Sequence, residues 1–332
     1  MKRCRRMLAH PLVPVGVALA VLVLLTAVGP AAAAQKKKEH EPSTWAATLA
    51  FEEGYTDNVQ WTGDSSKQDD AFFETIEGTF DWDNLPWRHA PDHAQAGVRG
   101  RIFNGFSERD YAEVYSGFGY DVGRTTVSLR YDYISNQIQV DQDANGDTVY
   151  ATSHALTVAA ERKILENKKL RVRGEFEADW DDSQGSSNAR DSFTPTGAFY
   201  VRYLFHDLFS PRVGVGYGVR DAKSSNYDRD ELEVEAAVDS RLSESFVMGL
   251  RYRWLMRDYT VGSPTTSNGG SNSNYNREDD AHHFEARLEY AVPVVEGLAI
   301  TARFRMRDNA SNRNSHDFNV HEGGLGVSYT YR

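Results

Sequence analysis

The sequence predicts an all-β fold, a transmembrane antiparallel up-and-down β-barrel of about 14 strands, with 12 or 16 strands as the alternatives. Three observations predict it. Apolar and charged residues alternate along many stretches, the connections between stretches alternate between long and short, and aromatic residues gather near the stretch ends. Alternation with a period of two indicates extended strands, because successive side chains of a strand point to opposite faces.

Residues 1–34 have the pattern of a secretory signal peptide. Lys2, Arg3, Arg5 and Arg6 precede an apolar run, and an Ala-x-Ala cleavage site ends at Ala34. The run is shorter than the roughly 20 residues of a spanning helix, which disfavours a retained membrane anchor. We therefore expect a short periplasmic N-terminal segment at 35–43 and an outer-membrane barrel at 44–332.

The charge balance argues against nucleic acid as a partner. Lysine and arginine number 37 against 48 acidic residues, and cleavage of the signal would remove four of the basic residues and none of the acidic ones. Proteins that bind nucleic acid usually carry a basic surface instead. The lone cysteine, Cys4, lies inside the predicted signal, so we expect no disulfide in the mature chain.

The stretch 168–180 shows the alternation most clearly. Leu170, Val172, Phe176 and Trp180 fall on one parity, whereas arginine, glutamate and aspartate fill the other. Similar stretches, each close to the nine to eleven residues of a tilted transmembrane strand, lie at 45–54, 72–82, 94–104, 125–134, 246–257, 282–291 and 298–307. We expect the apolar parity to face lipid and the charged parity to face the barrel interior.

The connections distinguish a membrane barrel from a soluble sandwich, whose strands also alternate. Odd-numbered connections are mostly long and polar, as at 57–70, 136–149, 181–191 and 260–279, and even-numbered ones are mostly short, as at 121–124, 240–245 and 293–297. Long loops at one rim and short turns at the other are typical of outer-membrane barrels. The exceptions are 105–110, which is short, and 83–93, which is long.

Aromatic residues near the strand ends predict two interfacial rings, where an aromatic body meets lipid and a polar edge meets water. We expect Tyr55, Phe103, Phe106, Trp180 and Tyr259 at the outer rim. The periplasmic ring would contain Trp45, Trp82, Trp87, Tyr203, Phe205, Tyr290, Tyr329 and Tyr331.

The charged parity supplies the candidate lumen-lining residues. These are Arg171, Arg173, Glu175, Glu233, Glu235, Arg251, Arg253, Glu285, Arg287, Arg303, Arg305 and Arg307. Simple antiparallel register across the turn at 292–296 would place Glu285 opposite Arg303. Two interpretations stay open: ladders of ion pairs that fill the lumen, or an arginine wall facing an acidic wall that selects solutes by charge.

One loop has the pattern of a calcium site. Asp141, Asp143, Asn145 and Asp147 take positions 1, 3, 5 and 7 of a calcium-binding loop around Gly146, but position 12 is not glutamate and the alternative is an ordinary polar turn. Calcium is therefore the one cofactor considered. The pairs Asp279–Asp280 and His282–His283 are too loosely spaced for a protease site, so we expect no enzyme activity.

The first predicted strand ends in Tyr55, Asp57, Asn58 and Val59. This Tyr-x-Asp-Asn-Val ending resembles that of Gram-negative outer-membrane barrels, including surface lipoprotein assembly modifiers and exopolysaccharide-associated barrels. The helical-repeat domain of the assembly modifiers has no counterpart here. The last strand, with Leu325, Val327, Tyr329 and Tyr331, is similar to the C-terminal signal that the barrel-assembly machinery binds, although it ends in Arg332.

These patterns favour a porin-like passive channel for small hydrophilic solutes or ions. The alternatives are an export or assembly barrel for polysaccharide or surface lipoprotein that works with periplasmic partners, and a structural or surface-interaction barrel. Expected partners are outer-membrane lipid and lipopolysaccharide, the barrel-assembly machinery during biogenesis, and the small solutes themselves. We expect the long loops outside the cell and both termini in the periplasm.

Overall fold

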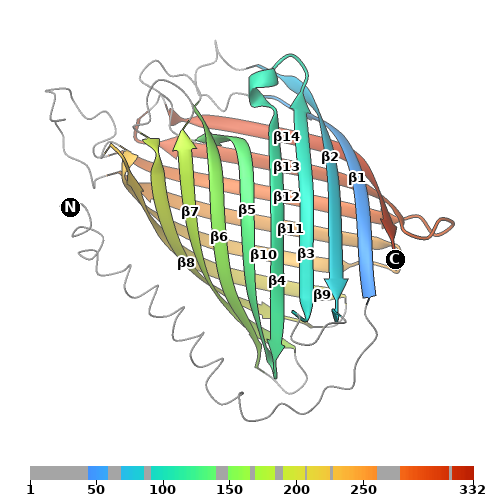
Figure 1. Cartoon of the computed structure of the whole chain (residues 1–332). Helices are drawn as coiled ribbons and strands as arrows, with labels where there is room; N and C mark the ends of the chain where they lie inside the picture. The colour runs from blue at the N-terminus through green and yellow to red at the C-terminus, as the bar shows by residue number, and fades with distance from the viewer. Residues whose placement is uncertain are drawn as a thin grey trace, which may run out of the picture.

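The chain forms a closed antiparallel β-barrel of 14 strands in the computed structural model, and the predicted fold is confirmed (Figure 1). The structure describes residues 44–58, 69–85, 91–139, 149–164, 169–183, 190–205, 208–224, 227–259, 277–313 and 316–332. The predicted signal peptide and residues 35–43 lie outside them. No α-helix in these ranges has the length and hydropathy needed to cross a membrane.

The strands are similar in length and follow one another around the barrel. They are β1 (Thr44–Thr56), β2 (Ala71–Asp83), β3 (His93–Phe103), β4 (Tyr111–Val122), β5 (Thr125–Gln139), β6 (Val149–Lys163), β7 (Leu170–Ser183), β8 (Ser192–Tyr203), β9 (Phe209–Ala222), β10 (Arg229–Arg241), β11 (Phe246–Asp258), β12 (Glu278–Ala291), β13 (Leu298–Ser311) and β14 (Phe318–Tyr331).

Up-and-down topology gives the barrel two different ends. We call the end that holds Thr44 and Tyr331 the terminal end, and the opposite end, where β1 continues towards β2, the loop end. All odd-numbered connections lie at the loop end, as the sequence predicts. The short connection between β3 and β4 is a true turn, with a single 3₁₀ turn at Ser107–Arg109.

Glycines allow the tight turns at the terminal end. Gly123 and Gly297 adopt φ values of 65° and 81°, which side chains of L-residues disfavour. Gly297 also corrects the predicted register between β12 and β13. Because Gly297 belongs to the turn, Glu285 lies opposite Arg305, and Arg303 lies opposite Arg287.

The first and last strands join to close the cylinder. Ten consecutive residue pairs, from Ala47 and Tyr331 to Thr56 and Glu322, connect β1 with β14. Inside this seam the Thr48 and Thr330 hydroxyl oxygens are 2.9 Å apart. Closure pairs the backbone groups of both edge strands, which a bilayer requires because unpaired polar groups are costly in hydrocarbon.

The outward face of the barrel is apolar. Leu49 is 64% exposed and Leu325 is 67% exposed, and further large apolar side chains on other strands share this exposure, among them Phe72, Ile76, Val98, Ile102 and Val213. A soluble protein rarely leaves so wide an apolar band in water. The architecture is therefore that of a transmembrane β-barrel, whose outer band contacts hydrocarbon.

Aromatic pairs lie near both ends of the barrel, although two residues depart from the prediction. At the terminal end, Trp45 packs against Phe80 and Tyr331, with ring centroids 6.0 and 5.5 Å apart. The prediction that Phe103 and Tyr259 belong to an interfacial ring is wrong, because both are buried. Phe103 instead packs in a cluster with Phe73 inside the barrel.

Candidate functional site

The charged face of the strands points into the barrel. Arg101 on β3 lies 3.5 Å from Glu322 on β14 and 3.9 Å from Glu52 on β1, measured between guanidinium nitrogens and carboxylate oxygens. Strands that are not neighbours can form such pairs only across the concave inner surface. The register then assigns every other residue of each strand to this surface.

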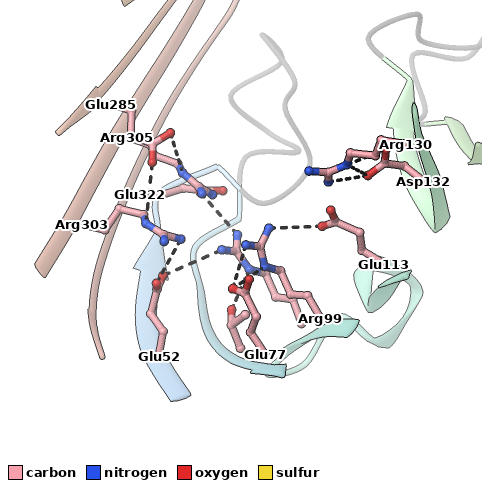
Figure 2. Close-up of polar contacts among 12 residues, drawn as sticks. Glu52, Glu77, Arg99, Glu113, Arg130, Asp132, Glu285, Arg303, Arg305 and Glu322 are labelled. Atoms are coloured by element: carbon pink, nitrogen blue, oxygen red, sulfur yellow. Dashed lines mark hydrogen bonds and ion pairs between the residues drawn. The ribbon is translucent and has the colours of Figure 1, made fainter. Parts of the chain in front are cut away.

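An ion-pair network bridges the seam on the inner wall (Figure 2). Arg303 lies 3.2 Å from Glu52 and 3.8 Å from Glu285. Arg305 lies 3.6 Å from Glu285 and 3.6 Å from Glu322. Together with Arg101, these residues link β12, β13, β14, β1 and β3, so the network holds the closing strands together by side chains as well as by backbone pairing.

Arg99 forms a second cluster beside the seam network (Figure 2). Its guanidinium lies 2.8 Å from Glu77 on β2 and 3.2 Å from Glu113 on β4. On β5, Arg130 lies 2.5 Å from Asp132. The two contacts of Arg99 join β3 to β2 and β4 on the lumen side, whereas the Arg130–Asp132 pair lies within β5. Cross-strand pairs of the Arg99 kind each contribute about 0.2–1 kcal/mol.

A third cluster surrounds Glu235 on β10. The Glu235 side chain is fully buried and lies between two arginines, with Arg212 of β9 at 2.6 Å and Arg251 of β11 at 2.5 Å. Both arginines remain more than one third exposed to the lumen. One carboxylate therefore joins three adjacent strands.

Several side chains near the loop end of the lumen pack closely against one another. The inward residues Phe73 and Val320 are buried, as are Tyr259 and Arg277 at this end. The Arg277 guanidinium carbon lies 4.3 Å from the centre of the Tyr259 ring, and that of Arg101 lies 4.1 Å from the centre of the Phe73 ring. Cation–π contacts of this kind stabilise the stacked arrangement.

A polar cavity of about 820 Å³ lies along the inner wall of β2 to β7. Its described lining includes three arginines, Arg130, Arg173 and Arg251, and six carboxylates, Asp81, Asp83, Asp132, Glu175, Glu177 and Asp179. Two of the arginines pair with acids of their own strand, since Arg130 contacts Asp132 and Arg173 lies 2.6 Å from Glu175. The lining is therefore acidic overall.

The opposite wall is basic. In the ring of 14 strands β6 and β13 are seven positions apart, so they face each other across the lumen. On β13, Arg303, Arg305 and Arg307 occupy successive inward positions. On β7, next to β6, Glu175, Glu177 and Asp179 do the same. The β7 wall therefore presents three successive carboxylates, and the β13 wall presents three successive arginines, of which Arg303 and Arg305 pair with Glu52, Glu285 and Glu322.

The structure places all twelve predicted lumen residues at inward register positions. It brings Glu235 together with Arg251, and Glu285 together with Arg303 and Arg305. It does not pair Glu233 or Arg253 with an oppositely charged group within 4.0 Å among the described residues. Whether these residues line a conducting path stays a prediction.

Sequence reasoning missed several members of the clusters. They are Glu52, Glu77, Arg99, Arg101, Glu113, Arg130, Asp132, Arg212 and Glu322. Each occupies the inward parity of its strand, so the same period-two argument would have found them. What the sequence does not contain is the pairing across the seam, which depends on the register of β14 with β1.

The two adjacent histidines of β12 point to opposite faces, as a strand requires. His282 lies outside, where its Nδ1 is 2.8 Å from the Tyr252 hydroxyl oxygen, and His283 lies inside. The predicted calcium loop with Asp141, Asp143, Asn145 and Asp147 lies outside the described residues. Within the described ranges, His, Cys, Asp and Glu side chains form no group of three that could hold a metal ion.

Comparisons with known proteins give similarity in fold. No family model and no curated protein sequence matches the chain. Solved structures similar to it include the outer membrane channel DcaP of Acinetobacter baumannii, with a TM-score of 0.49, 11% identity, and coverage of 89% of this chain and 99% of that chain. The loop L8 deletion mutant of OmpT, an outer membrane protein of Vibrio cholerae, has a TM-score of 0.46 at 9% identity, with 87% and 99% covered. OpdQ of Pseudomonas aeruginosa has a TM-score of 0.42 at 14% identity, with 88% and 99% covered.

Proposed function

We propose that the protein is a porin-like passive channel of the bacterial outer membrane for small hydrophilic solutes or ions. The observation that supports this most strongly is the two-sided wall: a continuous apolar exterior encloses an interior lined by charged side chains around a cavity of about 820 Å³. Only water and polar solutes are compatible with such an interior. A barrel of this strand number is wide enough to enclose an aqueous path.

The two ends of the barrel support an orientation. The start of β1 and the end of β14 both lie at the terminal end because the strand number is even, and we place that end in the periplasm with the long loops outside the cell. The apolar band would then contact outer-membrane lipid, with lipopolysaccharide around the loop end. The aromatic C-terminal strand would be the segment that the barrel-assembly machinery binds.

Charge separation across the lumen supports selection of solutes by charge. The arginines of β13 and the carboxylates of β7 create a field across the path, and low-dielectric walls strengthen such a field. The ion pairs have a second role, because paired side chains keep the wall in place. The two interpretations of the charged parity are therefore compatible.

Planar-bilayer recording tests the proposal. The purified wild-type barrel should give discrete conductance steps. The combined change of Arg303, Arg305 and Arg307 to Ser should shift the reversal potential in a salt gradient towards cation preference, whereas Arg162→Ser, on the outward face of β6, should leave it unchanged.

Circular dichroism would establish that each variant is folded. Absence of conductance in the wild type, even after shortening of the loops, would contradict the channel and favour the export or surface-interaction alternatives. Conductance with unchanged selectivity in the triple variant would show that these arginines do not line the path.

A further inference from the structure

Three basic side chains lie side by side on the inner wall of β11, β12 and β13. The register pairs Arg253 with His283, and His283 with Arg307. Neighbouring strands are about 4.8 Å apart, so the three side chains form one continuous row. We call Arg253, His283 and Arg307 the basic row.

Two carboxylates beside the basic row, Glu235 and Glu285, are already in contact with other arginines. Glu235 lies opposite Arg253, but it is held by Arg212 and Arg251. Glu285, one inward position from His283, contacts Arg303 and Arg305. Among the described residues, no carboxylate lies within 4.0 Å of the Arg253 guanidinium.

The loop-end side of the basic row is apolar or neutral. The next inward position on each strand is Leu255, Ala281 or Asn309, and all three are buried. The basic row itself is half-buried. It therefore lies next to these buried positions, on the side that faces the terminal end.

His283 carries a hydrogen-bonding atom without a partner. Its Nδ1 is buried and has no hydrogen-bond partner in the part of the chain that the structure describes. The charged groups that act on the ring most strongly are all arginines, led by Arg307 and Arg253. A buried polar atom without a partner costs about 1–3 kcal/mol, and an acceptor that reaches the imidazole would recover part of that cost.

We propose that the basic row binds a small oxyanion, such as the phosphate or carboxylate group of a solute. Two guanidinium groups flank an imidazole, and arginine matches both oxyanions with two parallel N–H donors. Arg251 and Arg305, one inward position nearer the terminal end, extend the positive wall along the approach. The inference rests on the proposed function only in that the site faces the lumen, since binding requires no conduction.

Equilibrium binding tests the site independently of conduction. Inorganic phosphate, and in a second series acetate, is titrated into the full-length purified barrel in detergent at constant ionic strength, and heat is measured by calorimetry. The wild type should show saturable binding. The variant Arg253→Gln should weaken it at least about tenfold, because charge-assisted hydrogen bonds contribute about 1.5–3 kcal/mol each.

Three further variants make the result specific. Arg253→Lys keeps the charge but not the two-pronged donor, so it should bind more weakly than wild type and more tightly than Arg253→Gln. His283→Leu should also weaken binding. The matched control is Arg202→Gln. Arg202 lies on the inward face of β8 and pairs with Asp239 at 3.3 Å, so this variant should bind phosphate as tightly as the wild type does.

Four possible results would each support or overturn the oxyanion site. Absence of saturable binding of both anions to the wild type would overturn the site, as would equal affinity in wild type and Arg253→Gln. If Arg202→Gln weakened phosphate binding as much as Arg253→Gln does, the binding would reflect the overall charge of the lumen and not a site at the basic row. Binding by a barrel that conducts no ions would leave the site intact and refute only the channel.

Discussion

Glu235 provides the sharpest test of how the lumen charges stabilise the barrel. Its buried carboxylate is the shared partner of Arg212 and Arg251 at 2.6 and 2.5 Å. The variant Glu235→Gln keeps the shape of the side chain and removes its charge. Two guanidinium groups are then left facing each other without the anion between them.

The expected loss of folding free energy follows from the burial of Glu235 and of its two arginine partners. Loss of one partner from a fully buried ion pair costs about 3–5 kcal/mol. Because both arginines are more than one third exposed, and solvent screens exposed charges, we expect a loss at or below the lower end of this range, about 2–3 kcal/mol. That corresponds to a fall of roughly 30- to 150-fold in the folding equilibrium constant.

Urea unfolding of the barrel in lipid vesicles, followed by tryptophan fluorescence, measures this difference. The control is Asp239→Asn on the same strand, whose carboxylate is 67% exposed and pairs with Arg202, and we expect a change below about 1 kcal/mol there. A loss below about 0.5 kcal/mol for Glu235→Gln, with unchanged dependence on urea, would refute the reasoning.

Two further predictions concern the seam and the exterior. A Cβ at Gly54 would lie 2.3 Å from the Phe73 ring and 2.6 Å from the Gly323 carbonyl oxygen. Gly54→Ala should therefore lower the folded yield in detergent refolding. Gly323→Ala is the control and should refold as the wild type does, because no atom lies within 4 Å of a Cβ at that position. Leu49→Arg places a charge on the lipid face and should cost about 2–4 kcal/mol in vesicles, whereas Thr48→Arg on the lumen face should cost less; equal costs for the two would contradict the assignment of faces.

Strand number and faces were accessible from the sequence because both follow from period-two alternation, as at 168–180. Register was not. The expected opposition of Glu285 and Arg303 failed by two residues because the number of turn residues, including Gly297, sets how the strands slide. A shift of two keeps every side chain on its face, so alternation cannot detect it.

The sequence also did not predict which side chains are buried inside the barrel. Phe103 and Tyr259 are of residue types typical of membrane interfaces, but Phe103 lies on the inward parity of β3 and both side chains are buried near the loop end. Likewise, the contacts of Arg101 with Glu322 and Glu52 join segments whose proximity arises only when the cylinder closes. The basic row follows from two registers, that of β11 with β12 and that of β12 with β13, and no single strand contains it.

Closure through the first and last strands also constrains biogenesis. Thr48 and Thr330 are separated by 282 positions, so no nascent chain can form this contact before its synthesis is nearly complete. Pairing of such distant segments carries a large entropic cost and slows folding. Until β1 and β14 pair, both edge strands expose unpaired backbone groups that can pair with other chains.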